Sequence, residues 1–294
     1  MFLQQLLNGV SLGSIYALTA VGYSLIYSVL SLINMSHASV FLSSAILFYS
    51  FFNFGGSGMP ILPAFLLTLA FAAVMGLVIE RVAIRPIREK GDGMTYALIS
   101  SIGVKTIIEN LCQTFFGSEI KSYPTLLEGK YIEIGNARMA AIQIVIIGSA
   151  VLVLLALAWF TQRTKTGKGL RALSQNLNAC YLMGIPVNRM VGVAFAVGSM
   201  LAAVAGVAFC MYYQTVAVNI GAVIGNKAFA STVLGGIGVL SGSVLGGFII
   251  GIVEMFTAGY ISSSYRNLVA FSILIFVLIV KPTGLLGKKE QTKV

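Results

Sequence analysis

Hydrophobic residues form long runs along this chain, and short polar or charged clusters separate the runs. Nine runs have about the length of a membrane-spanning helix, which needs roughly 20 mostly apolar residues. They lie near residues 3–30, 35–53, 61–84, 94–116, 140–161, 188–213, 224–240, 243–262 and 266–281. The run at 224–240 is short and rich in glycine, so it is expected either to cross at a tilt or to be re-entrant.

The composition excludes a soluble protein. A soluble domain carries about a quarter charged residues, which would be roughly 73 in a chain of this length. This chain of 294 residues has 28 (19 Lys and Arg, 9 Asp and Glu), and 57% of its residues are hydrophobic. The sequence therefore predicts an all-α polytopic membrane protein with about eight to nine transmembrane helices. A soluble enzyme and a nucleic-acid-binding protein are excluded, despite the net charge of +10.

The positions of the basic residues predict an orientation. Thirteen of the nineteen Lys and Arg lie in the loop 81–93, in the segment 162–189 and in the tail from Lys281. Nine alternating spans put these three segments on one side of the membrane, and the positive-inside rule makes that side cytoplasmic. The C-terminus is then cytoplasmic and the loop of about 117–138 is external. Within this loop, residues 129–136 alternate apolar and polar side chains, so we expect a small hairpin there.

Candidate catalytic and metal-binding groups are sparse. The single histidine, His37, has no acidic neighbour in sequence, and the three cysteines are scattered, so no metal site is predicted. The sequence contains no phosphate-binding loop, and the chain therefore has no recognisable means of hydrolysing ATP. Only Lys105, Glu109 and Glu254 were placed well within predicted spans. Lys105 and Glu109 share a helix face, either as a structural pair or as part of a polar pathway.

Two further patterns lie in the apolar runs. Gly238, Gly242 and Gly246 recur at every fourth position, a spacing that gives a helix a smooth face for close packing or for a moving gate. The second pattern is a polar break at residues 32–39, between the first two spans. Its polar side chains are expected either to cap the second span or to line a path for a small polar solute; they are Asn34, Ser36, His37 and Ser39.

The most informative segment is the basic stretch of about 162–189. Its leucines fall near a helical period among small and polar residues, which predicts a short amphipathic helix that ends at Gly184 and Pro186. Such a helix is too short to span a bilayer. It is expected either to lie on the lipid surface or to dock onto a cytoplasmic partner.

The same stretch carries an ordered pattern of Gly169, Leu170, Arg171, Ala172, Asn176, Ala179, Gly184 and Ile185. This pattern resembles the coupling-loop motif of permease subunits of ABC importers of the branched-chain amino-acid (LivH-type) family. The likeness covers nearly the whole chain, from the opening helix at 7–18 through the basic loop at 80–86 to the ending at 281–287. One departure falls at the polar break. Where the family usually has Ile-Asn-Phe-Ala-His-Gly, this chain has Ile33-Asn34-Met35-Ser36-His37-Ala38.

The resemblance implies a single permease domain over residues 1–294 with a type II-like ABC importer bundle. It implies a multi-pass protein of the bacterial or archaeal inner membrane that imports amino acids, with branched-chain amino acids as the leading substrate, by alternating access. The implied partners are a homologous second permease (LivM-type), two cytoplasmic ATPases and a periplasmic or extracellular solute-binding protein. The ATPases would bind ATP and Mg²⁺, so neither a cofactor nor a catalytic residue is expected in this chain.

Three alternatives stay open at this point. A permease of the same family could carry urea, a short amide or another small polar solute. An ion-coupled secondary transporter or a channel would need no ATPase, but such proteins usually place more ionisable residues within the membrane. A membrane-embedded enzyme is disfavoured because the sequence shows neither paired acids nor a metal cluster nor an activated nucleophile.

Overall fold

The structure, a computed structural model, describes residues 1–52, 59–90, 94–123, 129–135 and 137–287. A helix occupies each of the nine predicted spans, so the all-α polytopic fold class is confirmed. The helices are α1 (Phe2–Leu30), α2 (His37–Phe52), α3 (Ile61–Ile79), the π-helical turn η2 (Glu80–Ile84), α4 (Arg85–Lys90), α5 (Met94–Phe116), α6 (Ala141–Arg163), α7 (Lys165–Leu173), α8 (Leu177–Leu182), α9 (Val187–Tyr213), α10 (Ile220–Gly235), α11 (Leu240–Tyr260), the 3₁₀ turn η3 (Ser263–Tyr265) and α12 (Arg266–Val280).

Six helical segments in the described part of the chain are long and apolar enough to cross a membrane: α1, α3 with its continuation to Lys90, α6, α9, α11 and η3 with α12. The helices α2 and α10 are apolar but have only 16 residues each. At 1.5 Å per residue each measures about 24 Å, less than the roughly 30 Å of a bilayer's hydrocarbon core. The remaining predicted span, α5, has 23 residues and a more polar composition.

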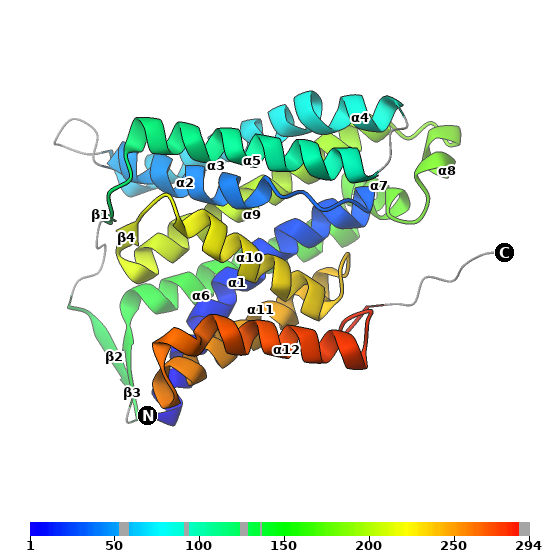
Figure 1. Ribbon diagram of the computed structural model, residues 1–294. Helices are drawn as coiled ribbons and strands as arrows, with labels where there is room; N and C mark the ends of the chain where they lie inside the picture. Colours follow the sequence, from blue (N-terminus) through cyan, green and yellow to red (C-terminus); the bar gives the residue numbers. More distant parts are fainter. Residues whose placement is uncertain (53–58, 91–93, 124–128, 136, 288–294) are drawn as a thin grey trace.

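The two ends of the bundle differ (Figure 1). Four short strands lie at the end where the chain begins, and α4, α7 and α8 lie at the opposite end, which we call the basic end. The strands are β1 (Lys121–Ser122), β2 (Tyr131–Ile134), β3 (Ala137–Ala140) and β4 (Thr215–Val216). Two of the three basic segments therefore meet at one end, as an alternating path requires. The tail lysines at 288, 289 and 293 and the loop residues 124–128 and 136 lie outside the described residues.

The strands form two small antiparallel pairs. β1 pairs with β4, which joins the segment after α5 to the segment after α9. β2 and β3 form a hairpin in which Tyr131 lies opposite Ala140. The hairpin predicted within 129–136 is therefore shifted along the chain, because that stretch supplies only the first strand and the turn at Gly135, whose φ is 60°.

The helix α1 passes through the middle of the bundle, with α2, α3 and α5 on one side and α11 and α12 on the other (Figure 1). Every residue from Ser11 to Ile26 is buried. Glycines on the neighbouring helices allow this close packing. A Cβ atom at Gly251 of α11 would overlap the backbone of Gly13, and one at Gly247 would overlap the backbone of Ala17. Small residues thus bring two helix backbones together where lipid offers no hydrophobic driving force between helices.

A buried ion pair joins α10 to α11 beside α1. Lys227 Nζ lies 2.7 Å from Glu254 Oε1, and the Tyr16 hydroxyl of α1 donates a hydrogen bond of 2.8 Å to Glu254 Oε2. All three side chains are buried. Each carboxylate oxygen therefore has its own donor, the condition under which a charge is tolerated in a low-dielectric interior. The prediction that only Lys105, Glu109 and Glu254 lie well within spans is therefore wrong, because Lys227 is buried in α10 as well.

We expect the substitution Gly251→Ala to destabilise the protein, because the new methyl group would occupy the space of the Gly13 backbone and push α1 away from α11. Overpacking of this kind typically costs about 1–3 kcal/mol. Gly148→Ala on α6 is the matched control, since a Cβ there has no neighbour within 4 Å and alanine favours a helix over glycine. Thermal unfolding of the detergent-solubilised variants is the measurement. Equal melting temperatures for the two variants would contradict the close approach of α1 and α11.

The ion pair predicts a large coupling energy between Lys227 and Glu254. The single variants Lys227→Met and Glu254→Gln should each lower the free energy of unfolding by about 3–5 kcal/mol, because Glu254→Gln leaves the lysine, and Lys227→Met the carboxylate, as a buried unpaired charge. The double variant should lose less free energy of unfolding than the sum of the two single losses, since neither charge remains. Unfolding in mixed micelles by added dodecyl sulfate gives the three values. Additive losses would show that the two side chains do not interact.

Candidate functional site

The coupling-like stretch predicted at 162–189 folds as two short helices at the basic end. Thr164 caps α7 by accepting a hydrogen bond from the Gly167 amide at 2.9 Å. Asn176 caps α8 by accepting one from the Ala179 amide, also at 2.9 Å. The prediction of a single amphipathic helix is therefore wrong: the polar residues Ser174, Gln175 and Asn176 end the first helix, and the Asn176 side chain starts the second.

This pair of helices is anchored on one side and free on the other. Leu170 and Leu173 of α7 and Cys180 of α8 are buried against the bundle. At the far side of α8, Leu182 is 89% exposed and Met183 is 80% exposed. Gly184 follows with a φ of 72°, which turns the chain back toward Pro186 and α9. The result is an apolar tip, formed by Tyr181, Leu182 and Met183, that projects from the bundle and is available to a partner.

The other predicted coupling residues lie along the same two helices. Gly169 packs beside the sulfur of Met190, Ala172 is half-buried, Ala179 is exposed and Ile185 packs against the core. The Arg171 side chain is exposed and donates a hydrogen bond of 3.4 Å to the Gln162 carbonyl. The structure thus brings all eight residues into one segment, and their role in coupling stays a prediction.

A polar cluster connects this segment to α3. Glu80 is buried and binds two guanidinium groups, that of Arg85 at 2.9 Å and that of Arg88 at 3.4 Å. Arg88 Nη2 also donates to Asn188 Oδ1 at 2.5 Å, and Asn188 Nδ2 donates to Glu89 Oε1 at 2.9 Å. We call these five residues the Arg88 cluster. It fixes α4 to the first turn of α9, which directly follows the coupling segment.

The contact between Arg88 and Asn188 was not predicted from the sequence. They lie 100 positions apart in the chain, and their contact arises only when η2 and α4 fold against the start of α9. Glu80 and Arg85 were noted as part of the basic loop, without a partner for the carboxylate. The available signal was Glu80 itself, a lone acid at the end of an apolar run that is followed by several basic residues.

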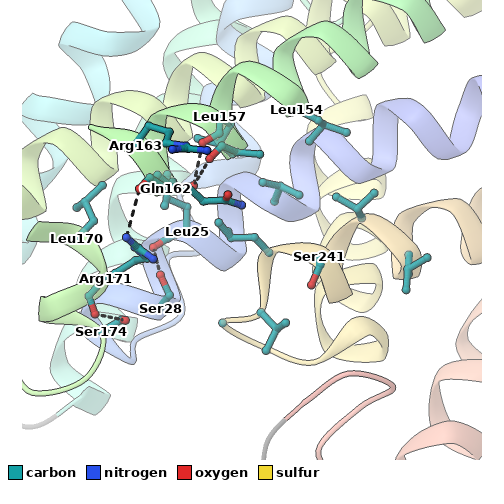
Figure 2. Close-up of a pocket in the computed structure, with 18 of the residues that line it drawn as sticks. Leu25, Ser28, Leu154, Leu157, Gln162, Arg163, Leu170, Arg171, Ser174 and Ser241 are labelled. Atoms are coloured by element: carbon teal, nitrogen blue, oxygen red, sulfur yellow. Dashed lines mark hydrogen bonds between the residues drawn. The ribbon is translucent and has the colours of Figure 1, made fainter. Parts of the chain in front are cut away.

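A cavity of about 1460 Å³ lies next to the coupling segment, among α1, α6, α7 and the start of α11 (Figure 2). Its walls are largely apolar, with Leu25, Leu154 and Leu157 among them. Arg163 and Arg171 line its basic end. Its volume exceeds the roughly 300–1,000 Å³ that is usual for a small-molecule site. Movement of α7 would change its shape because Leu170, Arg171 and Ser174 form part of its wall.

The polar break between α1 and α2 is buried within the chain. Asn34 Oδ1 accepts hydrogen bonds from the Ser36 amide at 3.2 Å and from the Ser36 hydroxyl at 2.6 Å. The Ser39 hydroxyl donates to the Ser36 carbonyl at 2.7 Å. The His37 imidazole packs against Gly22 and the Tyr23 ring. Asn34 and Ser36 thus bind each other in the turn before α2, and both the capping role and the path-lining role stay predictions. None of the four side chains lines the large cavity at the basic end or the smaller cavity beside α5.

The two remaining predicted sets lie on α5 and around α11. Lys105 Nζ is 3.9 Å from Glu109 Oε1, and each side chain is 25% exposed. Gly242 and Gly246 face α10, where a Cβ would overlap the Gly235 or Ser231 backbone. Gly238 does not share this face, which corrects the sequence prediction. It lies in the turn before α11 with a φ of 82°, a conformation that glycine adopts readily.

The comparisons with known proteins cover almost the entire chain. A family model described as "Branched-chain amino acid transport system / permease component" matches residues 5–278. The high-affinity branched-chain amino acid transport system permease protein BraD of Pseudomonas aeruginosa is 38% identical over 305 residues, covering 100% of this chain and 98% of BraD. The corresponding protein LivH of Escherichia coli is 36% identical over 305 residues, with the same coverage.

More distant relatives include the autoinducer 2 import system permease protein LsrC of Enterobacter, which is 39% identical over 106 residues, or 35% of this chain. No solved structure matches the chain. The family model and the full-length relatives agree with the helical bundle and its apolar spans. This chain belongs to the family of branched-chain amino acid transport system permease components.

Proposed function

We propose that this chain is the membrane-spanning permease subunit of an ATP-driven importer of branched-chain amino acids. Full-length similarity to BraD and LivH is the observation that carries the proposal, since both relatives are named as permeases of high-affinity systems for these solutes. The similarity to LsrC, named for a different solute, covers about a third of the chain. Leucine, isoleucine and valine are therefore the preferred substrates, ahead of urea, amides or other small polar solutes.

The proposed partners follow from the coupling segment. Two cytoplasmic ATPases would bind ATP and Mg²⁺ and dock on the apolar tip at Tyr181, Leu182 and Met183. This arrangement places the basic end, with the C-terminus, in the cytoplasm, in agreement with the positive-inside rule. A homologous second permease of the LivM type would complete the membrane part. An external solute-binding protein would deliver the amino acid at the end that carries the strands.

The contacts at the basic end suggest how movement of the ATPases reaches the bundle. The chain passes from α8 through Gly184 and Pro186 directly into α9, so a displaced tip acts on the start of α9. The Arg88 cluster then links α9 to α4 and, through buried Glu80, to the end of α3. α7 forms part of the wall of the large cavity. One movement can therefore shift helices and reshape a cavity without any catalytic group in this chain.

Reconstitution tests the proposed function. Proteoliposomes that contain this chain, the second permease and the ATPases should accumulate labelled leucine only when ATP and the loaded binding protein are both present. The driving energy then comes from ATP hydrolysis by the partners. Labelled urea serves as the comparison solute. Leucine uptake driven by an ion gradient in the absence of the ATPases would contradict the proposal, and uptake of urea instead of leucine would assign a different substrate.

The apolar tip predicts a specific loss of docking. Leu182→Glu should reduce co-purification of the ATPases at least ten-fold, because an apolar contact is replaced by a charge that must be desolvated on binding. The matched control is Tyr131→Glu, which introduces the same charge at an exposed apolar residue of the β2–β3 hairpin, at the other end of the bundle. Both variants should insert and purify normally. Equal recovery of the ATPases with the two variants would overturn the docking assignment.

A further inference from the structure

From Thr106 onward, the exposed surface of α5 is divided into a polar stripe and an apolar stripe, whereas in the first half of the helix the same face as the polar stripe carries the exposed Ile99 and Ile102. Thr106, Asn110 and Gln113 are exposed at successive helical turns, and Ile107, Leu111 and Phe115 are exposed about a quarter-turn away. A hydrocarbon environment suits the second stripe and disfavours the first. The polar stripe of α5, defined as Thr106, Asn110 and Gln113, therefore faces something other than lipid.

The hydrogen bonds on the polar stripe remain within α5. Thr106 Oγ1 donates to the Ile102 carbonyl at 3.0 Å, and Asn110 Nδ2 donates to the Thr106 carbonyl at 2.8 Å. These bonds satisfy the donors locally and connect α5 to no other described helix. A Cβ atom at Gly103, one turn before Thr106, would have no neighbour within 4 Å. The stripe is thus uncovered among the described residues, and its side chains are positioned to contact water or a solute.

A charged pair borders the polar stripe. Lys105 and Glu109 are 3.9 Å apart, which is close enough for an ion pair and too long for a hydrogen bond. Glu109 Oε1 is buried and accepts no hydrogen bond from any described residue. A pair at positions i and i+4 offsets only a small part of the cost of bringing two charges into a membrane. The geometry thus leaves both groups able to bind a further partner.

A cavity of about 440 Å³ extends from Glu109 toward the end of the bundle that carries the strands, and Lys105 lies one helical turn before Glu109, outside the lining of the cavity. Glu109, Asn110 and Gln113 form its polar wall, together with Asn219 just before α10. Its apolar wall includes Ala217, Val218 and Ala222. A free amino acid needs an acceptor for its ammonium group, a donor for its carboxylate and an apolar surface for its side chain. Within the cavity, Glu109 supplies the acceptor and the apolar wall supplies the surface for the side chain. Lys105 supplies the donor from just outside the cavity, 3.9 Å from Glu109.

We propose that the polar stripe of α5 lines the water-filled transport path and that Lys105, Glu109 and the adjoining cavity form a transit site for a zwitterionic amino acid. The inference deepens the proposed function and rests on it. The substrate's ammonium group would bind the Glu109 carboxylate and the side-chain amide oxygens of Asn110 and Gln113, and its carboxylate would bind Lys105. The second permease subunit would face the stripe from across the path and keep lipid away from it.

Cysteine labelling of the assembled complex tests the path. In a background without Cys112, Cys180 and Cys210, the variants Thr106→Cys and Asn110→Cys are compared with Ile107→Cys and Leu111→Cys. A cationic methanethiosulfonate reagent modifies only thiols that water reaches. We expect the thiols at positions 106 and 110 to react at least ten times faster than those at 107 and 111. Leucine added together with its binding protein should slow the reaction at positions 106 and 110. Equal rates for neighbouring positions would overturn the assignment of the path.

Charge substitutions test the transit site. Glu109→Gln and Lys105→Met should each lower leucine uptake at least ten-fold and reduce the number of leucines moved per ATP hydrolysed. The exchanged variant Lys105→Glu/Glu109→Lys keeps an ion pair but reverses its direction, so uptake should stay low. Uptake at the wild-type rate in Glu109→Gln, or its recovery in the exchanged variant, would show that the pair is only structural. Absence of uptake by the wild-type complex would instead refute the proposed function.

Discussion

The burial of α1 is the constraint on which the rest of the structure depends. A helix that touches neither water nor lipid over most of its length must be enclosed by other helices, and Gly247 and Gly251 let α11 approach its backbone closely. Several of its buried hydroxyl groups are satisfied internally, although the Ser24 hydroxyl has no partner among the described residues. Thr19 donates to the Ile15 carbonyl, and the Tyr16 hydroxyl donates to Glu254. The neighbouring helices are thus arranged around α1, and polar residues that face outward, such as those of α5, have to serve another purpose.

Much of this fold could be predicted because hydropathy directly reflects the bilayer. Helix boundaries followed from apolar runs, and counting charges correctly grouped two of the three basic segments at one end. The predictions that failed concerned features that depend on local geometry or on contacts between residues far apart in the chain. The break between α7 and α8 arises from one side-chain cap at Asn176. Lys227 was overlooked because its partner Glu254 lies 27 positions away and becomes its neighbour only when α10 packs on α11.

The candidate sites likewise divide into those with contiguous residues, which could be predicted, and those formed by distant residues, which could not. The stretch at 162–189 could be singled out from sequence because its residues are contiguous and form a recognisable pattern, and its role in coupling stays a prediction. The Arg88 cluster was not, since Asn188 meets Arg88 across 100 positions. On α5, the spacing of Lys105 and Glu109 predicted their shared face, but not the cavity beside them. That cavity is formed with residues 217–222, which a helical repeat within α5 does not reveal.

The continuity of α9 has one more consequence. Its 27 residues run without interruption from the Arg88 cluster to Tyr213, and β4 follows at once, paired with β1 just beyond α5. One continuous helix therefore connects the basic end of the bundle to the end that carries the strands. Thermodynamic linkage makes such a connection reciprocal. If binding at one end of α9 changes the affinity for a ligand at the other end, that ligand changes the affinity at the first end by the same factor. Under the proposed function, solute delivery at the strand end and ATPase binding at the basic end would therefore bias the same conformational equilibrium.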